Sequence, residues 1–255
     1  MIKLNFIYGF YNFIFMNNIE KKVFKIFLEK NNKLKNNTKI NILDVGCYKG
    51  QFSLSLYKKF NDEEQKKLKF YLIDANDRYK NFFKENFTFD FKFFKFAIDD
   101  KAAGKKKFYI NNYYEASGSS LKGGSFKDKN YIKSRTLIQK FINPFTKIGK
   151  MVKTRYVPTI NLSDFCKKNK IKNIHILKID TEGTEIDVLK GLKKIKNKIS
   201  IICIEIQGDK NEIERKISFV KNNLKKDFKL VYKKRIYIAS FLTNIHSYDF
   251  IFSKI

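Results

Sequence analysis

An aspartate followed by two glycines has the spacing of a loop that binds a nucleoside-type ligand. The stretch Asp44-Val-Gly46-Cys-Tyr-Lys-Gly50 has the form D-x-G-x-x-x-G, which is related to the dinucleotide pattern G-x-G-x-x-G but distinct from it. Gly46 would let the backbone approach a ligand closely, and Gly50 would permit the turn into a following helix. The amides at the start of that helix can receive a carboxylate. We expect Cys47 and Tyr48, between the glycines, to contact the same ligand.

Further acids close the next apolar runs of the sequence. Asp74 follows the run 69–73, and a carboxylate at that place can accept hydrogen bonds from both hydroxyls of an unphosphorylated ribose. Ala75 and Asn76 come directly after it, and Asp99 follows a third run, so we expect all of them near the ligand. The loop and the acid together predict a nucleoside-type cofactor, and S-adenosylmethionine offers both a ribose and, on its methionine end, a carboxylate.

The elements around these residues alternate between strand and helix. Such alternation predicts an α/β fold with a doubly wound, mostly parallel sheet of seven strands, and two late strands without a helix between them indicate an antiparallel hairpin. We expect strands at 39–45, 69–73, 93–98, 174–179, 199–206, 228–233 and 248–253. We expect helices at 17–35, 52–60, 77–86, 161–169, 184–192 and 212–225.

Ligands of such sheets bind beyond the carboxyl ends of the strands, at the point where the winding reverses. Asp44, Asp74, Asp99 and Asp180 each close an expected strand. The fold is therefore expected to bring these four acids to one edge of the sheet.

Two regions do not fit the alternation. Residues 101–158 contain a strand-like KKFYI, a Ser/Gly-rich stretch at 117–125 and a helical pattern at 131–142, but no regular apolar period. We interpret them as an insertion that overhangs the site and shapes the acceptor pocket.

Residues 1–38 are expected to form a helical segment before the domain. Their apolar run, Phe6–Met16, is too short for a bilayer helix of about 20 residues. It is expected to pack on the domain or to complete a homodimer contact, and interfacial anchoring to a membrane is the alternative.

Charge and cysteine content restrict the partners and the compartment. The net charge of +29 favours polyanions, but short runs such as Lys105–Lys107 and Lys193–Lys196 are isolated, so we expect solvated faces and no dedicated nucleic-acid site. Weak contact with an anionic membrane surface is compatible with this charge.

Cys47, Cys166 and Cys203 have no spacing typical of a disulfide framework or a metal site. They fit a reducing cytoplasm and a protein without a bound metal.

Four stretches resemble the FkbM-type family of class I S-adenosylmethionine-dependent methyltransferases. They are INILDVGCYKGQFS at 40–53, YLIDAN at 71–76, SGSSL at 117–121 and LKIDTEGTEIDVLKG at 177–191. The resemblance covers about residues 40–255, and it implies a Rossmann-like methyltransferase domain over 39–255 in which Ser119 also contacts the cofactor. Two departures stand out: Asp74 replaces a common Glu, and Cys47-Tyr48 replaces a small residue followed by Asn.

The resemblance implies methylation of a hydroxyl oxygen on a saccharide, glycolipid or small natural product. Such a reaction needs alignment of the acceptor and removal of its proton. Asp180 and Glu182 are candidates for both tasks, although Glu182 would also suit the N-terminus of the next helix. His246, expected in the segment that joins the last two strands, is the preferred base, and Glu205 is the second candidate. His175, inside a strand, is interpreted as a core residue.

Two other functions remain open from the sequence. The charge would suit an RNA methyltransferase, but the residues after the fourth strand are DTEG and not the N/D-P-P-aromatic turn typical of enzymes that methylate base nitrogens. A non-catalytic basic adaptor built on the same fold is the second alternative, and it would not bind S-adenosylmethionine.

Overall fold

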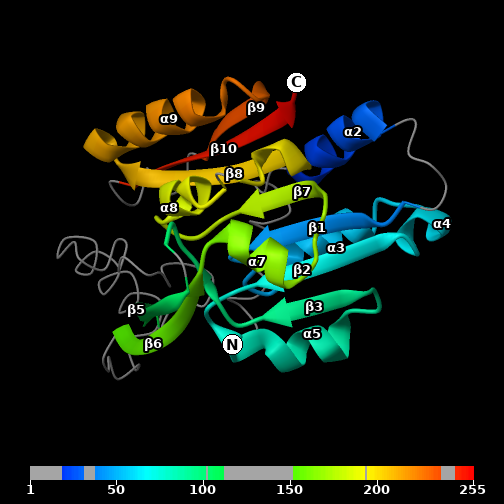
Figure 1. The fold of residues 1–255 in the computed structure, drawn as a ribbon, viewed down its shortest axis with the longest axis horizontal. Helices are drawn as coiled ribbons and strands as arrows, with labels where there is room; N and C mark the ends of the chain where they lie inside the picture. Colours follow the sequence, from blue (N-terminus) through cyan, green and yellow to red (C-terminus); the bar gives the residue numbers. More distant parts are fainter. Residues whose placement is uncertain (1–18, 32–37, 102, 112–151, 193, 237–244) are drawn as a thin grey trace, which may run out of the picture.

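A seven-stranded sheet forms the centre of the protein, with the order β3-β2-β1-β7-β8-β10-β9 (Figure 1). The computed structural model describes residues 19–31, 38–101, 103–111, 152–192, 194–236 and 245–255. Neighbouring strands from β3 to β8 are parallel, whereas β10 is antiparallel to both β8 and β9. The winding reverses between β1 and β7. The strands are β1 (Ile40–Val45), β2 (Leu68–Ile73), β3 (Phe91–Phe94), β7 (Ile174–Ile179), β8 (Ile199–Asp209), β9 (Phe228–Ile236) and β10 (Ile245–Lys254).

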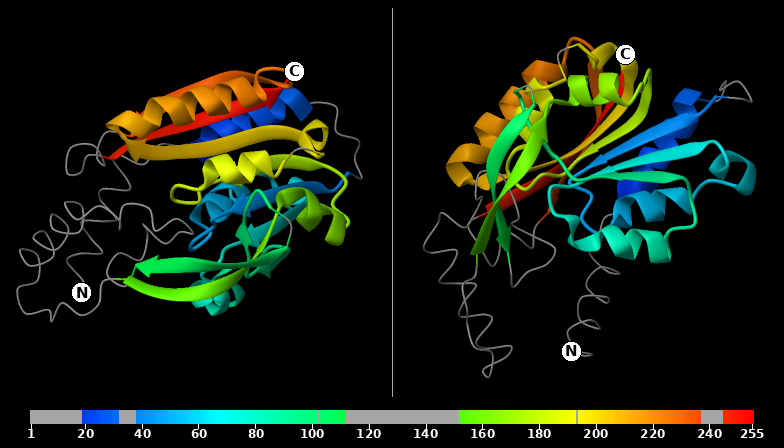
Figure 2. Two further views of the ribbon diagram at one scale, coloured as in Figure 1. Left: turned by 60° about the vertical axis from the view of Figure 1, so that its left-hand side comes forward. Right: turned by 60° about the horizontal axis from the view of Figure 1, so that its bottom comes forward.

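Helices cover both faces of this sheet (Figure 2). One face packs against α2 (Ile19–Asn31), α3 (Gln51–Tyr57) and α5 (Lys80–Asn86). The other face packs against α7 (Leu162–Lys168), α8 (Glu185–Lys190) and α9 (Lys210–Leu224). Shorter helices complete the described chain: α4 (Asp62–Gln65), η1 (Asp77–Tyr79) and η3 (Lys196–Lys198). The predicted doubly wound α/β fold with an antiparallel C-terminal strand is confirmed.

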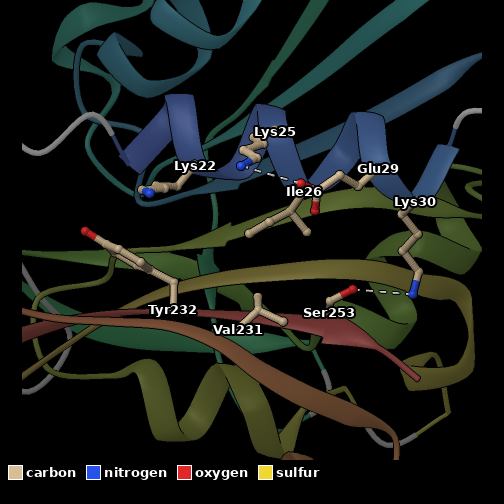
Figure 3. A pocket seen from close by; sticks show the side chains of 8 residues that line it. All are labelled: Lys22, Lys25, Ile26, Glu29, Lys30, Val231, Tyr232 and Ser253. Atoms are coloured by element: carbon tan, nitrogen blue, oxygen red, sulfur yellow. Dashed lines mark hydrogen bonds and ion pairs between the residues drawn. The ribbon is translucent and has the colours of Figure 1, made fainter.

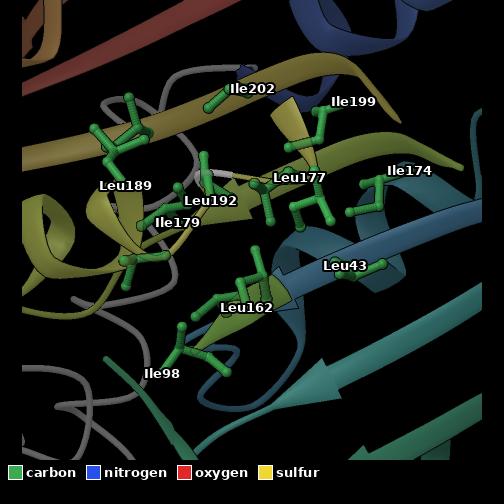
Figure 4. Packing of buried hydrophobic residues seen from close by; sticks show 14 of the residues in the cluster. Leu43, Ile98, Leu162, Ile174, Leu177, Ile179, Leu189, Leu192, Ile199 and Ile202 are labelled. Atoms are coloured by element: carbon green, nitrogen blue, oxygen red, sulfur yellow. The ribbon is translucent and has the colours of Figure 1, made fainter. Parts of the chain in front are cut away.

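The central strands are buried on both faces, which explains their continuous apolar sequences. All six residues of β7 are buried. Leu177 and Ile179 point toward α7 and α8 and pack with Leu162 and Leu189 (Figure 4). Ile176 points to the opposite face. Lys178 is the one charged residue of this strand, and it is buried as well.

A second, smaller sheet corrects two expectations from the sequence. The single strand expected at 93–98 is two strands, because β3 ends at Phe94 and β4 (Ala97–Ile98) pairs with β6 (Val152–Ile160) in a sheet of order β4-β6-β5. KKFYI lies in β5 (Gly104–Asn111), as its pattern indicated, and β5 pairs antiparallel with β6. Residues 152–158 were expected to be irregular. Their strand was missed because Lys153 and Arg155 occupy the same face as the buried Val157 and Thr159, which hides the apolar alternation.

The last two strands also extend further than expected. The apolar pattern suggested 228–233 and 248–253, whereas pairing continues from Ser253 opposite Lys229 to Ser247 opposite Ile236. Residues 117–125 and 131–142, with Ser119, lie outside the described residues, as does the run 6–16. Within the described ranges, no helix combines the length and the apolar character that a membrane span requires.

Candidate cofactor and acceptor site

The loops after β1, β2 and β7 are bonded to one another at the carboxyl edge of the sheet. The Gly46 amide donates to the carbonyl of Ile73 at 2.8 Å, and the Asp180 amide donates to the carbonyl of Val45 at 2.9 Å. These bonds continue the ladders of β1 with β2 and of β1 with β7 past the last paired residues. The structure thus brings the predicted glycine loop, Asp74 and Asp180 together at the point where the winding reverses.

The glycine loop has a backbone that other residues could not easily adopt. Gly46 has φ +80°, and a Cβ added to it would lie 1.8 Å from the carbonyl oxygen of Asp180. Gly50 has φ +67°, and its added Cβ would lie 2.7 Å from the Phe87 ring. Between them Tyr48 also has a positive φ, 48°, which is unfavourable for a side chain of this size. The backbone of the loop therefore turns tightly at the strand ends.

Asp44 lies in β1, just before this loop. Its side chain is buried, and its Oδ2 accepts a hydrogen bond of 2.6 Å from the hydroxyl of Ser53 in α3. Burial raises the pKa of Asp44 to about 6. The bond to Ser53 joins β1 to the helix that follows the loop. Contact of Asp44 with the cofactor stays a prediction.

Asp74 is held for ligand binding by two backbone amides. Tyr48 donates to its Oδ2 at 2.9 Å and Asn76 donates to its Oδ1 at 2.7 Å. Burial raises the pKa of Asp74 to about 6, and these two hydrogen bonds limit the rise. Each carboxylate oxygen can accept more than one hydrogen bond, so acceptor capacity remains for the hydroxyls of a ribose. The carboxylate and the loop around it fit the nucleoside end of S-adenosylmethionine.

The other residues predicted to contact the cofactor differ in the surroundings of their side chains. Cys47 and Ala75 turn their side chains into the core, so that only their backbones can meet a ligand. The side chain of Asn76 accepts a hydrogen bond from the Arg78 amide. Asp99 is buried at the end of β4 and forms an ion pair with Lys106 of β5.

The turn after β7 is shaped by an acid that the sequence analysis did not single out. Glu185 Oε1 accepts hydrogen bonds from the Gly183 amide at 2.7 Å and from the amide and hydroxyl of Thr181 at 3.3 and 3.2 Å. The turn places Glu182 at φ 55° and Gly183 at φ +107°, and an added Cβ on Gly183 would meet nothing within 4 Å. The only sequence signal for Glu185 was its place in the first turn of a helix.

Beyond Asp180, the same edge of the sheet carries further buried polar groups. Lys178 donates to Asp180 Oδ2 at 3.2 Å. On the next strand Glu205 is opposite Asp249 of β10. Burial alone would lower the pKa of Lys178, but Asp180, Glu205 and Asp249 outweigh it and raise this pKa well above its usual range. Lys178 is thus a charged ammonium among carboxylates.

Glu205 is half-buried, and one of its carboxylate oxygens is anchored. Ser247 and Gln207 both donate to its Oε1, at 2.7 and 2.8 Å. Within the described residues no hydrogen bond is donated to its Oε2. Burial, followed by the negative charges of Asp180 and Asp249, raises the pKa of Glu205 to about 8. Since Ile204 pairs with Ile179, Glu205 lies level with Asp180.

His246 does not lie where the sequence analysis expected it. It is part of β10, opposite Gly208, and its Nδ1 is 2.7 Å from an Arg235 side-chain nitrogen. It stands three residues from Asp249, which at about 3.3 Å per residue places it roughly 10 Å along the strand. The odd spacing also turns it to the other face of the sheet from Asp249. The structure therefore does not bring His246 together with Asp180 and Glu205.

His175 is buried and accepts a hydrogen bond from the Asn41 amide, as expected of a core residue.

A basic groove lies at the opposite end of the sheet, between α2 and the strands β9 and β10 (Figure 3). Its volume is about 400 Å³. It is lined by Lys22, Lys25, Ile26, Glu29, Lys30, Val231, Tyr232 and Ser253. None of the predicted site residues is among them. In the described residues no cluster of three or more His, Cys, Asp or Glu side chains could hold a metal ion.

The strand order and the loops at its reversal point define a Rossmann-like class I methyltransferase. The family model of the methyltransferase FkbM domain matches residues 6–233. The chain therefore belongs to the FkbM methyltransferase family, and S-adenosylmethionine is its cofactor. No curated protein matches the chain significantly.

Several solved methyltransferase structures are similar to this chain in fold. The N-methyltransferase NodS from Bradyrhizobium japonicum WM9, in complex with S-adenosyl-L-homocysteine, is 7% identical over 93% of this chain and 86% of that chain, with a TM-score of 0.44. TrmK from M. capricolum, also with S-adenosylhomocysteine, is 15% identical over 94% and 69%, with a TM-score of 0.44. Precorrin-6y C5,15-methyltransferase from Geobacter metallireducens GS-15 is 6% identical over 93% and 89%, with a TM-score of 0.42.

Proposed function

We propose that this methyltransferase transfers a methyl group to a hydroxyl oxygen of a saccharide, glycolipid or small natural product, and that Glu205 accepts the hydroxyl proton. The observation that supports the proposal is the half-buried carboxylate of Glu205, anchored through Oε1 and level with Asp180 at the cofactor edge. A hydroxyl is a weak nucleophile until its proton is removed. A carboxylate with a raised pKa binds a proton more strongly, so it is a suitable base for a hydroxyl substrate.

The cofactor would be held by the groups already described. Asp74 would accept hydrogen bonds from the ribose hydroxyls, while the backbone of the loop from Gly46 to Gly50 and the start of α3 would meet the methionine end. When bound, S-adenosylmethionine supplies a methyl carbon activated by a positive sulfur. Asp180, fixed by Lys178, would orient the acceptor beside it.

Glu205 is suited to the proton transfer because its two oxygens have separate tasks. Oε1 is fixed by Ser247 and Gln207, so the direction of Oε2 is set before an acceptor binds. As the hydroxyl oxygen bonded to the methyl carbon, its proton would pass to Oε2 and the electron pair of the broken C–S bond would return to sulfur. The products would be the methyl ether, S-adenosylhomocysteine and a protonated Glu205.

Methylation of RNA is the second candidate, and the net charge of +29 is the observation that favours it. Incubation with ³H-methyl S-adenosylmethionine and either fractionated cell extract or total RNA would decide between the two. We expect label in a small or glycan product whose mass and fragmentation show a methyl ether. Label in RNA alone, or in an N-methyl product, would contradict O-methylation of such an acceptor.

A further inference from the structure

Arg155, on the strand β6, contacts the loop that follows the ribose-binding acid. Its two terminal nitrogens donate to the carbonyl of Ala75 and to Asp77 Oδ1, the latter at 2.9 Å. Lys95 forms an ion pair with the second oxygen of Asp77. Arginine is suited to this place because its planar guanidinium can donate to two acceptors at fixed angles.

The contact is reinforced by packing. Ala75 is buried in a small apolar cluster with Ala97 of β4 and with inward residues of β5 and β6, the other two strands of the smaller sheet. These residues are Phe108, Ile110 and Val157. Figure 1 shows β5 and β6 beyond the pointed ends of β2 and β3, next to the cofactor edge. The smaller sheet therefore holds the loop through both an apolar cluster and a charged side chain.

The contact of Arg155 leads to Asp74 in two steps. Arg155 fixes Ala75 and Asp77, and Asn76 between them donates its amide to Asp74 Oδ1 at 2.7 Å. The positive charge of Arg155 also lowers the pKa of Asp74, against the larger effect of burial. Loss of the guanidinium would release the loop, turn the amide of Asn76 away and weaken the hold on the carboxylate.

We propose that Arg155 is a positioning residue for the cofactor, which sets affinity for the adenosine half of S-adenosylmethionine by fixing residues 75–77 behind Asp74. Arg155 belongs to the segment that the sequence analysis assigned to acceptor recognition. The segment thus serves cofactor binding as well, through a side chain that does not itself need to touch the ligand.

Calorimetric titration with S-adenosylhomocysteine and with 5′-methylthioadenosine tests the proposal without any knowledge of the acceptor. Arg155→Met keeps the apolar stem and removes the guanidinium, and we expect both ligands to bind about tenfold more weakly, because both carry the adenosine half. Arg155→Lys should recover part of the loss. Lys153→Met, which removes an exposed charge from the same strand, should leave both affinities within twofold of the parent.

A double variant distinguishes positioning from general damage to the fold. If Arg155 acts through Asp77, Arg155→Met combined with Asp77→Asn should lose no more affinity than the larger single loss. If Arg155→Met is partly misfolded, the titration will show fewer binding sites per chain. The affinity of Arg155→Lys then serves as the test in its place. Parent-like affinity of both Arg155 variants, or additive losses in the double variant, would overturn the proposal.

Discussion

Gly46 lies directly against the backbone of Asp180, so the cofactor loop and the turn after β7 are packed without room for a methyl group. An added Cβ on Gly46 would be 1.8 Å from the Asp180 carbonyl oxygen, and that carbonyl cannot move as the end of a flexible side chain can. The two loops that enclose the site are thus in mutual contact, and a change in one must displace the other.

Gly46→Ala is expected to separate these loops. The clash and the positive φ should together lower the free energy of unfolding by about 3 kcal/mol, and binding of S-adenosylhomocysteine should fall below detection. Gly183→Ala is the matched control, since Gly183 also has a positive φ but its added Cβ meets nothing within 4 Å. It should lose less stability in urea unfolding. Equal losses in the two variants would show that the contact with Asp180 is unimportant.

The buried carboxylate of Asp44 is expected to cost stability at neutral pH. A folded pKa of about 6, above the ordinary 3.8, means that the folded state holds its proton more tightly, so stability falls as the pH rises from about 4 through 6. Asp44→Asn keeps an acceptor for Ser53 and removes the charge. At pH 7.5 it should be more stable than the parent by roughly 2 kcal/mol, and by less at pH 4.5. Urea unfolding at both pH values measures this, and a difference that does not change with pH would contradict it.

The parts of the site that the sequence predicted are those that local backbone geometry requires. Gly46 and Gly50 are needed for a positive φ and a close approach, and Asp74 must close a strand, so both features leave a pattern within a few residues. Arg155 and Ser247 leave none, because their partners depend on strands and loops that only the folded chain brings together. Their side chains could equally have been solvated.

The position of His246 shows the same limit for the fold. Local apolar alternation ends near residues 233 and 248, so the segment between them read as a loop. The ladder between β9 and β10 continues because each strand satisfies the other's backbone groups. The Arg235 side chain contacts His246 at the end of that ladder. Pairing between strands determines such lengths, and a single sequence does not show it.

Lys178 is expected to stabilise the fold as the counter-ion of the buried acids. Lys178→Met fills a similar volume but removes the ammonium that binds Asp180 and offsets the charges of Glu205 and Asp249, and breaking a buried pair in this way typically costs about 3–5 kcal/mol. The loss should be largest above pH 8, where Glu205 is ionised. Lys92→Met, an exposed lysine of β3, should be neutral in the same urea unfolding series. A Lys178 variant as stable as the parent at pH 8.5 would show that the acids need no counter-ion.

Glu205→Gln is expected to remove the base while preserving the shape of the site. Gln can still accept hydrogen bonds from Ser247 and Gln207, so affinity for S-adenosylhomocysteine should stay within twofold, while the methylation rate falls about 100-fold, within the usual range for loss of a general base. The sign of the pH dependence follows from the raised pKa: Glu205 can accept a proton only when ionised, so the parent's rate should rise with pH through about 8. The groups that face it are Asp180, Asp249, Lys178, Ser247 and Gln207.

The comparison that decides the identity of the base is with His246→Ala. His246 is engaged with Arg235 and stands away from Asp180, so its loss should change the rate by less than about threefold and leave the rise through pH 8 intact. The Glu205 variant should lack that rise. If His246→Ala loses as much activity as Glu205→Gln, or if Glu205→Gln keeps the parent's pH profile, then Glu205 is not the proton acceptor. Affinity for S-adenosylhomocysteine, measured on the same preparations, separates that result from a failure of cofactor binding.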